Sequence, residues 1–167
     1  MFKNRSTTDS TISYLIKRRP DATARIHGSE DYPDINGAVT FYQAPFGVFV
    51  ISSIKGLPSD QGEYGESILG FHIHEGKTCT GSGINAFADV GNHYNPDEFP
   101  HPYHAGDLPP LFAGNGYAWS AFLTRRFDIN EIIDKTIIIH NGSDDFTSQP
   151  SGNSGDKIAC GMIKRTN

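Results

Sequence analysis

Short stretches in which apolar and polar residues alternate recur along most of the chain. Residues 37–43 (Gly-Ala-Val-Thr-Phe-Tyr-Gln), for example, alternate in the manner of a strand. The same alternation, or a short apolar run, predicts seven strands at residues 22–27, 37–43, 48–54, 69–74, 117–124, 135–140 and 157–163. Only residues 128–134 look helical.

Glycine and proline residues punctuate these segments, and no repeat or low-complexity linker divides them. Several short strands separated by turn residues predict an all-β fold, an antiparallel sandwich or barrel. Two long segments, residues 75–115 and 141–156, show no obvious period. Loops longer than about 12–15 residues are uncommon unless they are functional or disordered. We expect both loops to be ordered, and a bound metal is the obvious candidate for what orders them.

Length and charge narrow the class of protein. A chain of 167 residues fits one domain with a sizeable core. The net charge of -5 and the lack of a long basic run argue against nucleic acid as the main partner. No apolar run approaches the roughly 18 residues that span a membrane, so we expect no membrane partner. An acidic enzyme acting on an anion would need a local positive patch.

Residues 1–20 form a basic extension in front of a domain that we assign to residues 21–167. The apolar residues of the extension make a patch that is too short and too interrupted for the core of a signal peptide, and no small-residue cleavage site follows it. We therefore expect a cytoplasmic protein, with a transit peptide as the weaker alternative.

Only His27 stands apart from the other six histidines. Side chains alternate faces along a strand, so His72 and His74 project to the same side. His140 ends the apolar run Thr-Ile-Ile-Ile-His at the rim of another predicted strand, and His93 lies in the first long loop. Imidazole-rich tetragonal sites suit copper(II).

A second cluster follows in the same loop, where His101, His104 and Asp107 are spaced as H-x-x-H-x-x-D. Two imidazoles and a carboxylate need one further nitrogen to complete a tetrahedral zinc site. Seven side chains are too few for two separate four-coordinate sites, and an imidazole shared through its two nitrogens removes the shortfall. A single histidine is more often a surface or hydrogen-bonded core residue than a ligand, but six in this arrangement favour a two-metal centre.

The two cysteines, Cys79 and Cys160, lie far apart in the sequence. Two buried free thiols are the ordinary expectation inside cells. One disulfide that ties a loop to the last strand is the alternative, and cysteine counting alone does not choose between them.

At these motifs the sequence resembles the copper/zinc superoxide dismutases, over most of the chain. The blocks that carry the resemblance are Gly-Phe-His-Ile-His-Glu at 70–75, Gly-Asn-His-Tyr-Asn-Pro at 91–96, His-Ala-Gly-Asp-Leu-Pro at 104–109, Ile-Ile-His at 138–140 and Gly-Asn-Ser-Gly-Asp-Lys-Ile-Ala-Cys-Gly-Met-Ile at 152–163. The resemblance implies an eight-stranded Greek-key barrel with two long functional loops, formed by residues 21–167.

The resemblance also implies roles for individual residues. It assigns four copper ligands: His72, His74, His93 and His140. It assigns four zinc ligands, of which the first is the bridge between the metals: His93, His101, His104 and Asp107. Asp144 resembles the outer carboxylate that links a copper histidine to a zinc histidine, and such partners fix ring orientation and tautomer. Cys79 and Cys160 match the disulfide pair of the family.

Three features depart from the family pattern. The arginine that attracts superoxide in the family is Lys157 here, which keeps the charge but loses the planar fork of donors. The segment from His93 to Asp107 is shorter than in many members. The loop over residues 141–155 is short and carries few charges, so we expect less electrostatic guidance from it.

The implied function is the dismutation of superoxide to dioxygen and hydrogen peroxide. Its catalytic residues would be His93, which takes up and returns a proton, and Lys157, which attracts the anion. A homodimer is possible. The alternative is a non-enzymatic zinc-stabilised or copper-binding protein of the same fold, which the complete copper set disfavours; a third possibility is zinc alone in the cell.

Overall fold

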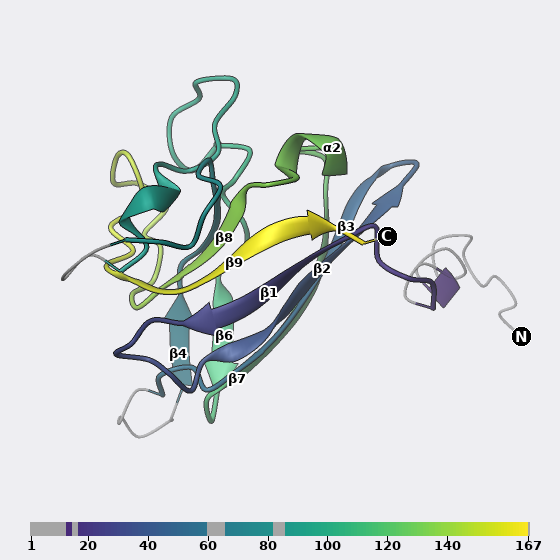
Figure 1. The fold of residues 1–167 in the computed structure, drawn as a ribbon. Helices are drawn as coiled ribbons and strands as arrows, with labels where there is room; N and C mark the ends of the chain where they lie inside the picture. The colour runs from purple at the N-terminus through teal and green to yellow at the C-terminus, as the bar shows by residue number, and fades with distance from the viewer. Residues whose placement is uncertain (1–12, 15–16, 60–65, 82–85, 167) are drawn as a thin grey trace, which may run out of the picture.

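The computed structural model describes residues 13–14, 17–59, 66–81 and 86–166 (Figure 1). Most of the predicted basic extension lies outside these residues, so both that extension and the cytoplasmic location stay predictions. In the part that is described, no helix is long and apolar enough to span a membrane.

The described fold consists of nine antiparallel strands, together with the short α-helix α2 and the 3-10 turn η1. The strands are β1 (Ala22–Gly28), β2 (Asn36–Ala44), β3 (Gly47–Lys55), β4 (Glu66–Leu69), β5 (Phe71–His74), β6 (Leu111–Gly114), β7 (Tyr117–Thr124), β8 (Thr136–His140) and β9 (Lys157–Arg165). The turn η1 covers Ala88–Val90, and the helix α2 covers Ile129–Ile132, within the predicted helical stretch.

The strands form one sheet in the order β4-β6-β7-β3-β2-β1-β9-β8-β5. Its two ends, β4 and β5, are joined in the chain by Gly70 alone, so the sheet curls into a nearly closed barrel. The Gly70 amide donates to the Gly142 carbonyl at 2.7 Å, and the Gly70 carbonyl accepts from the His140 amide at 2.9 Å. The backbone therefore changes neighbours at Gly70, pairing with β6 before it and with β8 after it.

This change of neighbours explains the strand count. The sequence predicts a single strand over residues 69–74, whereas the structure has β4 and β5; counted as one bent strand, they leave the eight strands of the expected barrel. The prediction that residues 75–115 lack a strand was wrong, because β6 covers Leu111–Gly114. Six other strands confirm the predicted segments.

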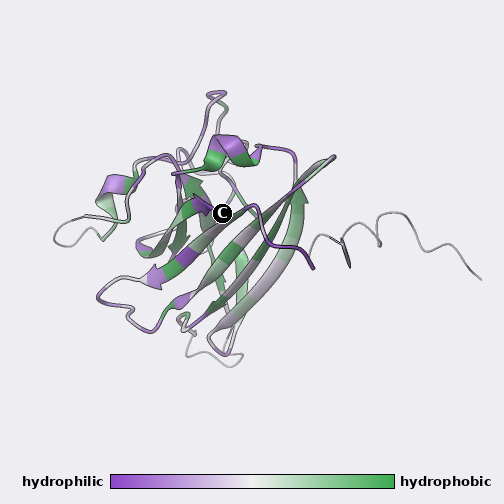
Figure 2. Cartoon of the chain, turned by 45° about the vertical axis from the view of Figure 1, so that its right-hand side comes forward, coloured by the Kyte–Doolittle hydropathy of each residue, from purple (hydrophilic) through white to green (hydrophobic). Residues whose placement is uncertain are grey.

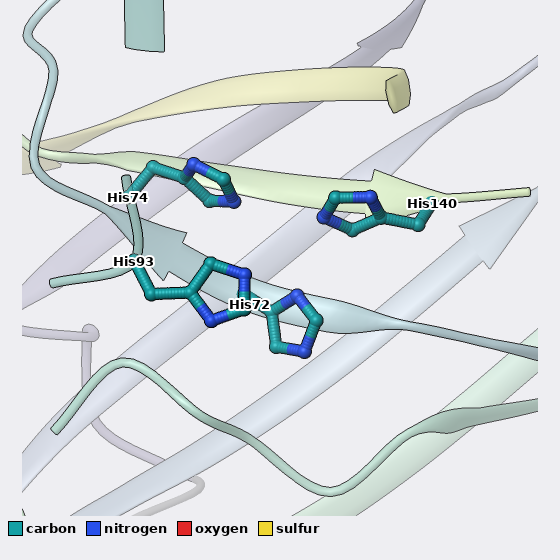
Figure 3. Close-up of side chains that lie close together, drawn as sticks. All are labelled: His72, His74, His93 and His140. Atoms are coloured by element: carbon teal, nitrogen blue, oxygen red, sulfur yellow. The ribbon is translucent and has the colours of Figure 1, made fainter. Parts of the chain in front are cut away.

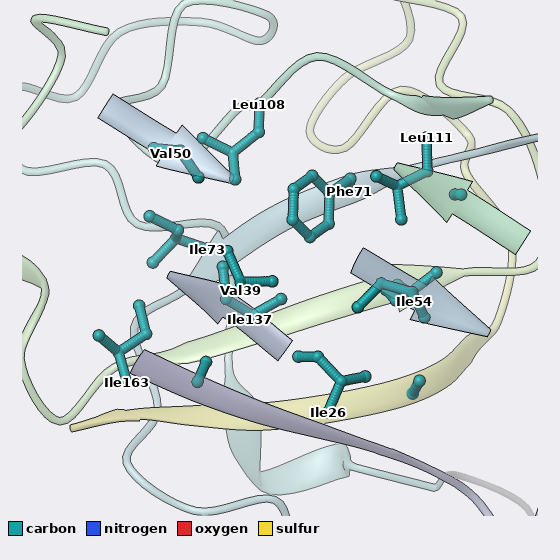
Figure 4. Close-up of a cluster of buried hydrophobic side chains, with 14 of the residues drawn as sticks. Ile26, Val39, Val50, Ile54, Phe71, Ile73, Leu108, Leu111, Ile137 and Ile163 are labelled. Atoms are coloured by element: carbon teal, nitrogen blue, oxygen red, sulfur yellow. The ribbon is translucent and has the colours of Figure 1, made fainter. Parts of the chain in front are cut away.

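The core fills the inside of this barrel with aliphatic and aromatic side chains (Figure 4). Its members come from nearly every strand and include Ile26, Val39, Val50, Ile54, Phe71, Ile73, Leu108, Leu111, Ile137 and Ile163, all almost fully buried. Burial of such a side chain contributes roughly 1.5–3 kcal/mol. Figure 2 shows the hydrophobic residues gathered on the strands, with more hydrophilic residues in the connections.

Alternation along β5 and β8 places the polar residues of these strands outside the barrel. Phe71 and Ile73 point into the core, so His72 and His74 point to the other face. This outer face is covered by the loops that follow β5 and β8, which is why the histidines on it are nevertheless buried.

Candidate metal centre

Four imidazoles meet on the outer face of β5 and β8 (Figure 3). Two come from β5 and one from the end of β8, as predicted. The fourth, His93, comes from the loop, and its backbone forms an antiparallel bridge with His74. The ring of His93 lies 4.0 Å from that of His72 and 4.8 Å from that of His74, measured between centroids. One nitrogen of each of the four residues lies within 4.8 Å of the others.

These four rings each have one buried nitrogen without a hydrogen-bond partner among the described residues. The unpaired atoms are His72 Nδ1, His74 Nε2, His93 Nε2 and His140 Nε2. An unsatisfied buried polar atom costs about 1–3 kcal/mol, so four in one cluster need an explanation. Convergent imidazole lone pairs are what a copper ion binds, and the set therefore fits copper.

The other nitrogen of three of these rings makes a hydrogen bond that fixes the tautomer. His74 Nδ1 donates to the Gly91 carbonyl at 2.9 Å, and His140 Nδ1 donates to the Gly155 carbonyl at 3.0 Å. His72 Nε2 lies 2.8 Å from a carboxylate oxygen of Asp144. Each contact holds the proton on one side of the ring and leaves the lone pair on the side that faces the cluster.

The four imidazoles above form a first set of possible metal ligands. A second set, His93, His101, His104 and Asp107, adjoins it and shares His93 with it. Asp107 Oδ1 lies 2.7 Å from His93 Nδ1 and 3.3 Å from His104 Nδ1, and Asp107 Oδ2 lies 3.1 Å from His101 Nδ1. All four residues are buried, and their ligand atoms lie within 4.8 Å of one another. Three imidazole nitrogens with one carboxylate fit tetrahedral zinc.

Asp144 joins the two sets from outside. Its Oδ2 accepts from His72 at 2.8 Å, and its Oδ1 accepts from His101 Nε2 at 2.9 Å. Burial acts to raise the pKa of Asp144, but the hydrogen bonds from His72, from the Phe146 amide and from His101 outweigh it and lower the pKa to about 2. Asp144 is thus a permanent anion at neutral pH, in the place that the sequence predicts for it.

Burial also favours the neutral form of His72, His74 and His140. Burial is the largest cause that lowers the pKa values of His72 and His74, and it is the largest cause that lowers the pKa of His140 to about 3. Neutral imidazole is the form that binds a metal. At pH 7 these three imidazoles can therefore bind a cation without first losing a proton.

A cavity of about 430 Å³ gives access to the first set. It is lined by four of the donor histidines, His74, His93, His104 and His140. Lys157 also lines it, and this residue stands opposite His140 in the register of β8 and β9. The structure thus brings the one predicted cation to the cavity over the histidines.

The disulfide expected from the family resemblance is present between Cys79 and Cys160. It ties the loop after β5 to β9, and Cys160 packs with Val90 and Ile138 beneath η1. The alternative of two free thiols was wrong.

Two further residues contribute to the centre, and no role was predicted for either of them from the sequence. Gln149 holds both backbone groups of His101: its Oε1 accepts from the His101 amide at 3.0 Å, and its Nε2 donates to the His101 carbonyl at 2.7 Å. Gly152 has a φ of 68° and passes so close to Asp144 that a Cβ atom would lie 2.1 Å from Oδ1. Both contacts join loop segments that are distant or irregular, so no local pattern predicts them.

Comparison with known proteins agrees with this centre. The family described as "Copper/zinc superoxide dismutase (SODC)" matches residues 35–163. The chain belongs to this family.

Individual relatives match most of the chain. The superoxide dismutase [Cu-Zn] of Legionella pneumophila is 34% identical over 152 residues, which cover 86% of this chain and 87% of the relative. That of Escherichia coli strain K12 is 35% identical, covering 77% and 78% of the two chains. Among solved structures, the Cu/Zn superoxide dismutase from Brucella abortus superimposes with a TM-score of 0.71 at 25% identity, covering 86% of this chain and 99% of that one.

Proposed function

We propose that His72, His74, His93 and His140 bind copper, and that the set centred on Asp107 binds zinc. The chain is a superoxide dismutase, an enzyme that converts superoxide to dioxygen and hydrogen peroxide with copper and zinc as cofactors. The observation that carries the residue assignment is the position of His93, whose Nε2 belongs to the unpaired nitrogens of the first set and whose Nδ1 lies 2.7 Å from Asp107 in the second.

A copper ion held by His72, His74, His93 and His140 would supply one-electron redox chemistry for superoxide. The residues of the chain orient this chemistry and supply charge and protons. Asp144 and the glycine carbonyls hold the imidazoles in one tautomer and one orientation. His93 Nε2 faces the other copper-set rings, and His93 lines the cavity, so this atom is placed to hold a proton that the peroxide product needs.

Lys157 serves as the cation that attracts the substrate. Superoxide is a small anion, so its encounter with the site depends on local charge and access. Lys157 lines the cavity with His140 and is the first residue of β9. A positive charge there compensates locally for the net charge of -5.

The test is a superoxide assay on the chain loaded with copper and zinc. We expect activity that requires both the loaded protein and an intact copper set, so His140→Ala should lose copper and activity while still retaining zinc. Full occupancy by both metals without activity above that of the His140→Ala variant would contradict the enzyme and favour the non-enzymatic metal-binding protein.

We further propose that the chain forms a homodimer through the outer face of β4, β6 and β7. Exposed apolar side chains gather there: Ile68, Phe112, Tyr117, Trp119 and Leu123. Ile68 and Phe112 are paired across β4 and β6, so the patch is continuous over neighbouring strands.

This face suits a second copy, because its apolar side chains fit the centre of an interface and polar residues around them complete the area. Its three aromatic rings are 48–68% exposed, which corresponds to roughly 350 Å² when an aromatic side chain offers about 150–250 Å². A standard interface takes about 800 Å² from each partner and has an apolar centre. A flat apolar patch on a sheet can pair with itself about a two-fold axis.

Sedimentation equilibrium tests the dimer. We expect the unmodified chain to sediment as a dimer and Trp119→Glu as a monomer. Phe99→Glu is the matched control, because Phe99 is an exposed aromatic residue that belongs to none of these strands. A monomeric unmodified chain, or equal dimerisation of Trp119→Glu and Phe99→Glu, would contradict the proposed interface.

A further inference from the structure

Arg126 reaches from the connection between β7 and α2 to the loop that carries the second donor set. Its Nη1 atom donates to three carbonyl oxygens of that loop: Pro102 at 3.0 Å, His104 at 3.0 Å and Asp107 at 3.1 Å. His104 and Asp107 are themselves members of the donor set. One nitrogen atom is thus hydrogen-bonded to the backbone at both ends of the turn from His104 to Asp107.

Single hydrogen bonds, and no continuous ladder, hold the rest of this loop: Gln149 bonds to the backbone of His101, and the Gly106 amide and carbonyl bond to Tyr94 and Ile73. Between His93 and Asp107 the described chain forms no regular strand or helix, and three prolines there lack the amide hydrogen of an ordinary residue. Backbone carbonyls outside a ladder need donors from elsewhere in the molecule. The turn itself contributes only a 3.2 Å bond from the Asp107 amide to the His104 carbonyl and a 3.0 Å bond from the His104 amide to Asp107 Oδ2.

The chemistry of arginine suits this task. A guanidinium is always charged and presents several donors in one rigid plane. Among the described residues the Arg126 guanidinium forms no ion pair, and its hydrogen bonds go to the three loop carbonyls; the Arg126 amide separately donates to Thr124 Oγ1 at 3.2 Å. Hydrogen bonds from a charged donor are about twice as strong as neutral ones. Fixing the His104 and Asp107 carbonyls limits where His104 Nδ1 and Asp107 Oδ1, 3.3 Å apart, can lie.

We propose that Arg126 is a positioning residue for the zinc site. Its hydrogen bonds go to the backbone of His104 and Asp107 and not to their metal-binding side-chain atoms. Through the backbone it holds both side chains in the arrangement that a tetrahedral metal site needs before the ion binds. The inference rests on the proposed assignment of this donor set to zinc, and it adds a residue for which the motifs of the family resemblance give no role.

The neighbouring residue provides a matched control. Arg125 is exposed and forms no hydrogen bond or ion pair with the described residues, although it carries the same charge on the same connection. Arg125→Gln and Arg126→Gln therefore remove the same charge from nearly the same place. Only the second removes the three loop contacts.

Cobalt(II), which takes the place of zinc and absorbs visible light, is the probe. Metal-free protein is titrated with cobalt(II), and both the affinity and the absorption spectrum of the bound ion are measured. Loss of an outer partner of a metal site typically costs about 10–100-fold in affinity, so we expect Arg126→Gln to bind cobalt(II) about 10-fold or more weakly with an altered spectrum. We expect Arg125→Gln to match the unmodified chain.

Arg126→Lys keeps the charge and three donors, so it should recover part of the affinity; it also keeps the test open if Arg126→Gln fails to fold. The inference is overturned if Arg126→Gln binds cobalt(II) with the affinity and spectrum of the unmodified chain, or if Arg126→Lys is no better than Arg126→Gln. Failure of the unmodified chain to bind cobalt(II) at these residues would instead overturn the proposed zinc assignment.

Discussion

At the scale of single residues, the centre depends on how each imidazole divides its two nitrogens. One ring nitrogen of His74 and one of His140 donate a hydrogen bond to a glycine carbonyl, and one ring nitrogen of His72 donates to Asp144. The remaining nitrogens face the cluster without a partner. These hydrogen bonds fix the tautomer of each ring before any metal is present. The rings therefore need little rearrangement when a metal ion binds.

Asp144, which accepts hydrogen bonds from His72 and His101, also restricts which residue can stand at position 152. Asp144 lies against Gly152, where a methyl group would lie within 2.1 Å of the carboxylate and 2.7 Å from His101 Nε2. Any larger residue at this position must displace Asp144 from one of its two imidazoles. The glycine is therefore required by close approach as well as by its positive φ.

Lys157→Glu gives the prediction at this scale. Reversing the charge beside His140 should reduce the rate of the copper- and zinc-loaded enzyme at low ionic strength by roughly 10-fold or more, because steering of an anion depends on the local field. Salt should then raise the rate instead of lowering it. The measurement is the rate with superoxide across a range of salt concentrations.

Lys55→Glu is the control, because it changes the net charge equally at an exposed residue that does not line the cavity. Equal rates and equal salt dependence of the two variants would show that Lys157 has no particular role.

At the scale of elements, strand periodicity explains how much of the site the sequence predicts. The side chains of His72 and His74 share a face because strands repeat every two residues, and that holds whatever packs around them. The strand β6 escaped prediction because it has only four residues and follows two prolines. The roles of Arg126 and Gln149 were not predicted, because their contacts are with residues 19 to 48 positions away along the chain. A local sequence pattern carries no information about contacts at that separation.

The disulfide fixes one loop against the sheet and supports a prediction about stability. It joins residues 81 positions apart, and closing a loop of this length stabilises a fold by about 4 kcal/mol in the chain-entropy account. We expect the double variant Cys79→Ser, Cys160→Ser to lose stability of that order, measured by urea unfolding of metal-free protein. An unchanged free energy of unfolding would mean that packing of η1 alone holds this loop.

At the scale of the whole molecule, a barrel with an ordinary apolar core carries its polar centre on the outer face, beneath two loops. The core residues of β5 and β8 alternate with the donor histidines, so the same strands stabilise the fold and position the site. Metal-free protein must keep buried, neutral imidazoles next to this core.

This burial predicts how the metal-free protein responds to acid. The pKa of His140 is about 3 in the folded chain, against about 6.5 in an unfolded one. Between these values the unfolded chain binds more protons, so the free energy of unfolding rises with pH and levels off above about 6.5. From pH 7.5 to pH 5 we expect a loss of about 2 kcal/mol from His140, with further losses in the same direction from His72 and His74.

Urea unfolding of chelator-treated protein at the two pH values measures this change. A metal-free protein that is equally stable at both, or more stable at pH 5, would show that these imidazoles are not buried as neutral groups.

The central claim is that the single imidazole of His93 connects two metal ions, and electron paramagnetic resonance tests it most directly. Copper(II) in the first set is recorded alone and then with cobalt(II) in the second. A shared ring couples the two unpaired-electron systems, so we predict that cobalt(II) strongly alters or removes the copper(II) signal. An unchanged copper(II) spectrum, with both ions bound to the same chain, would contradict the account.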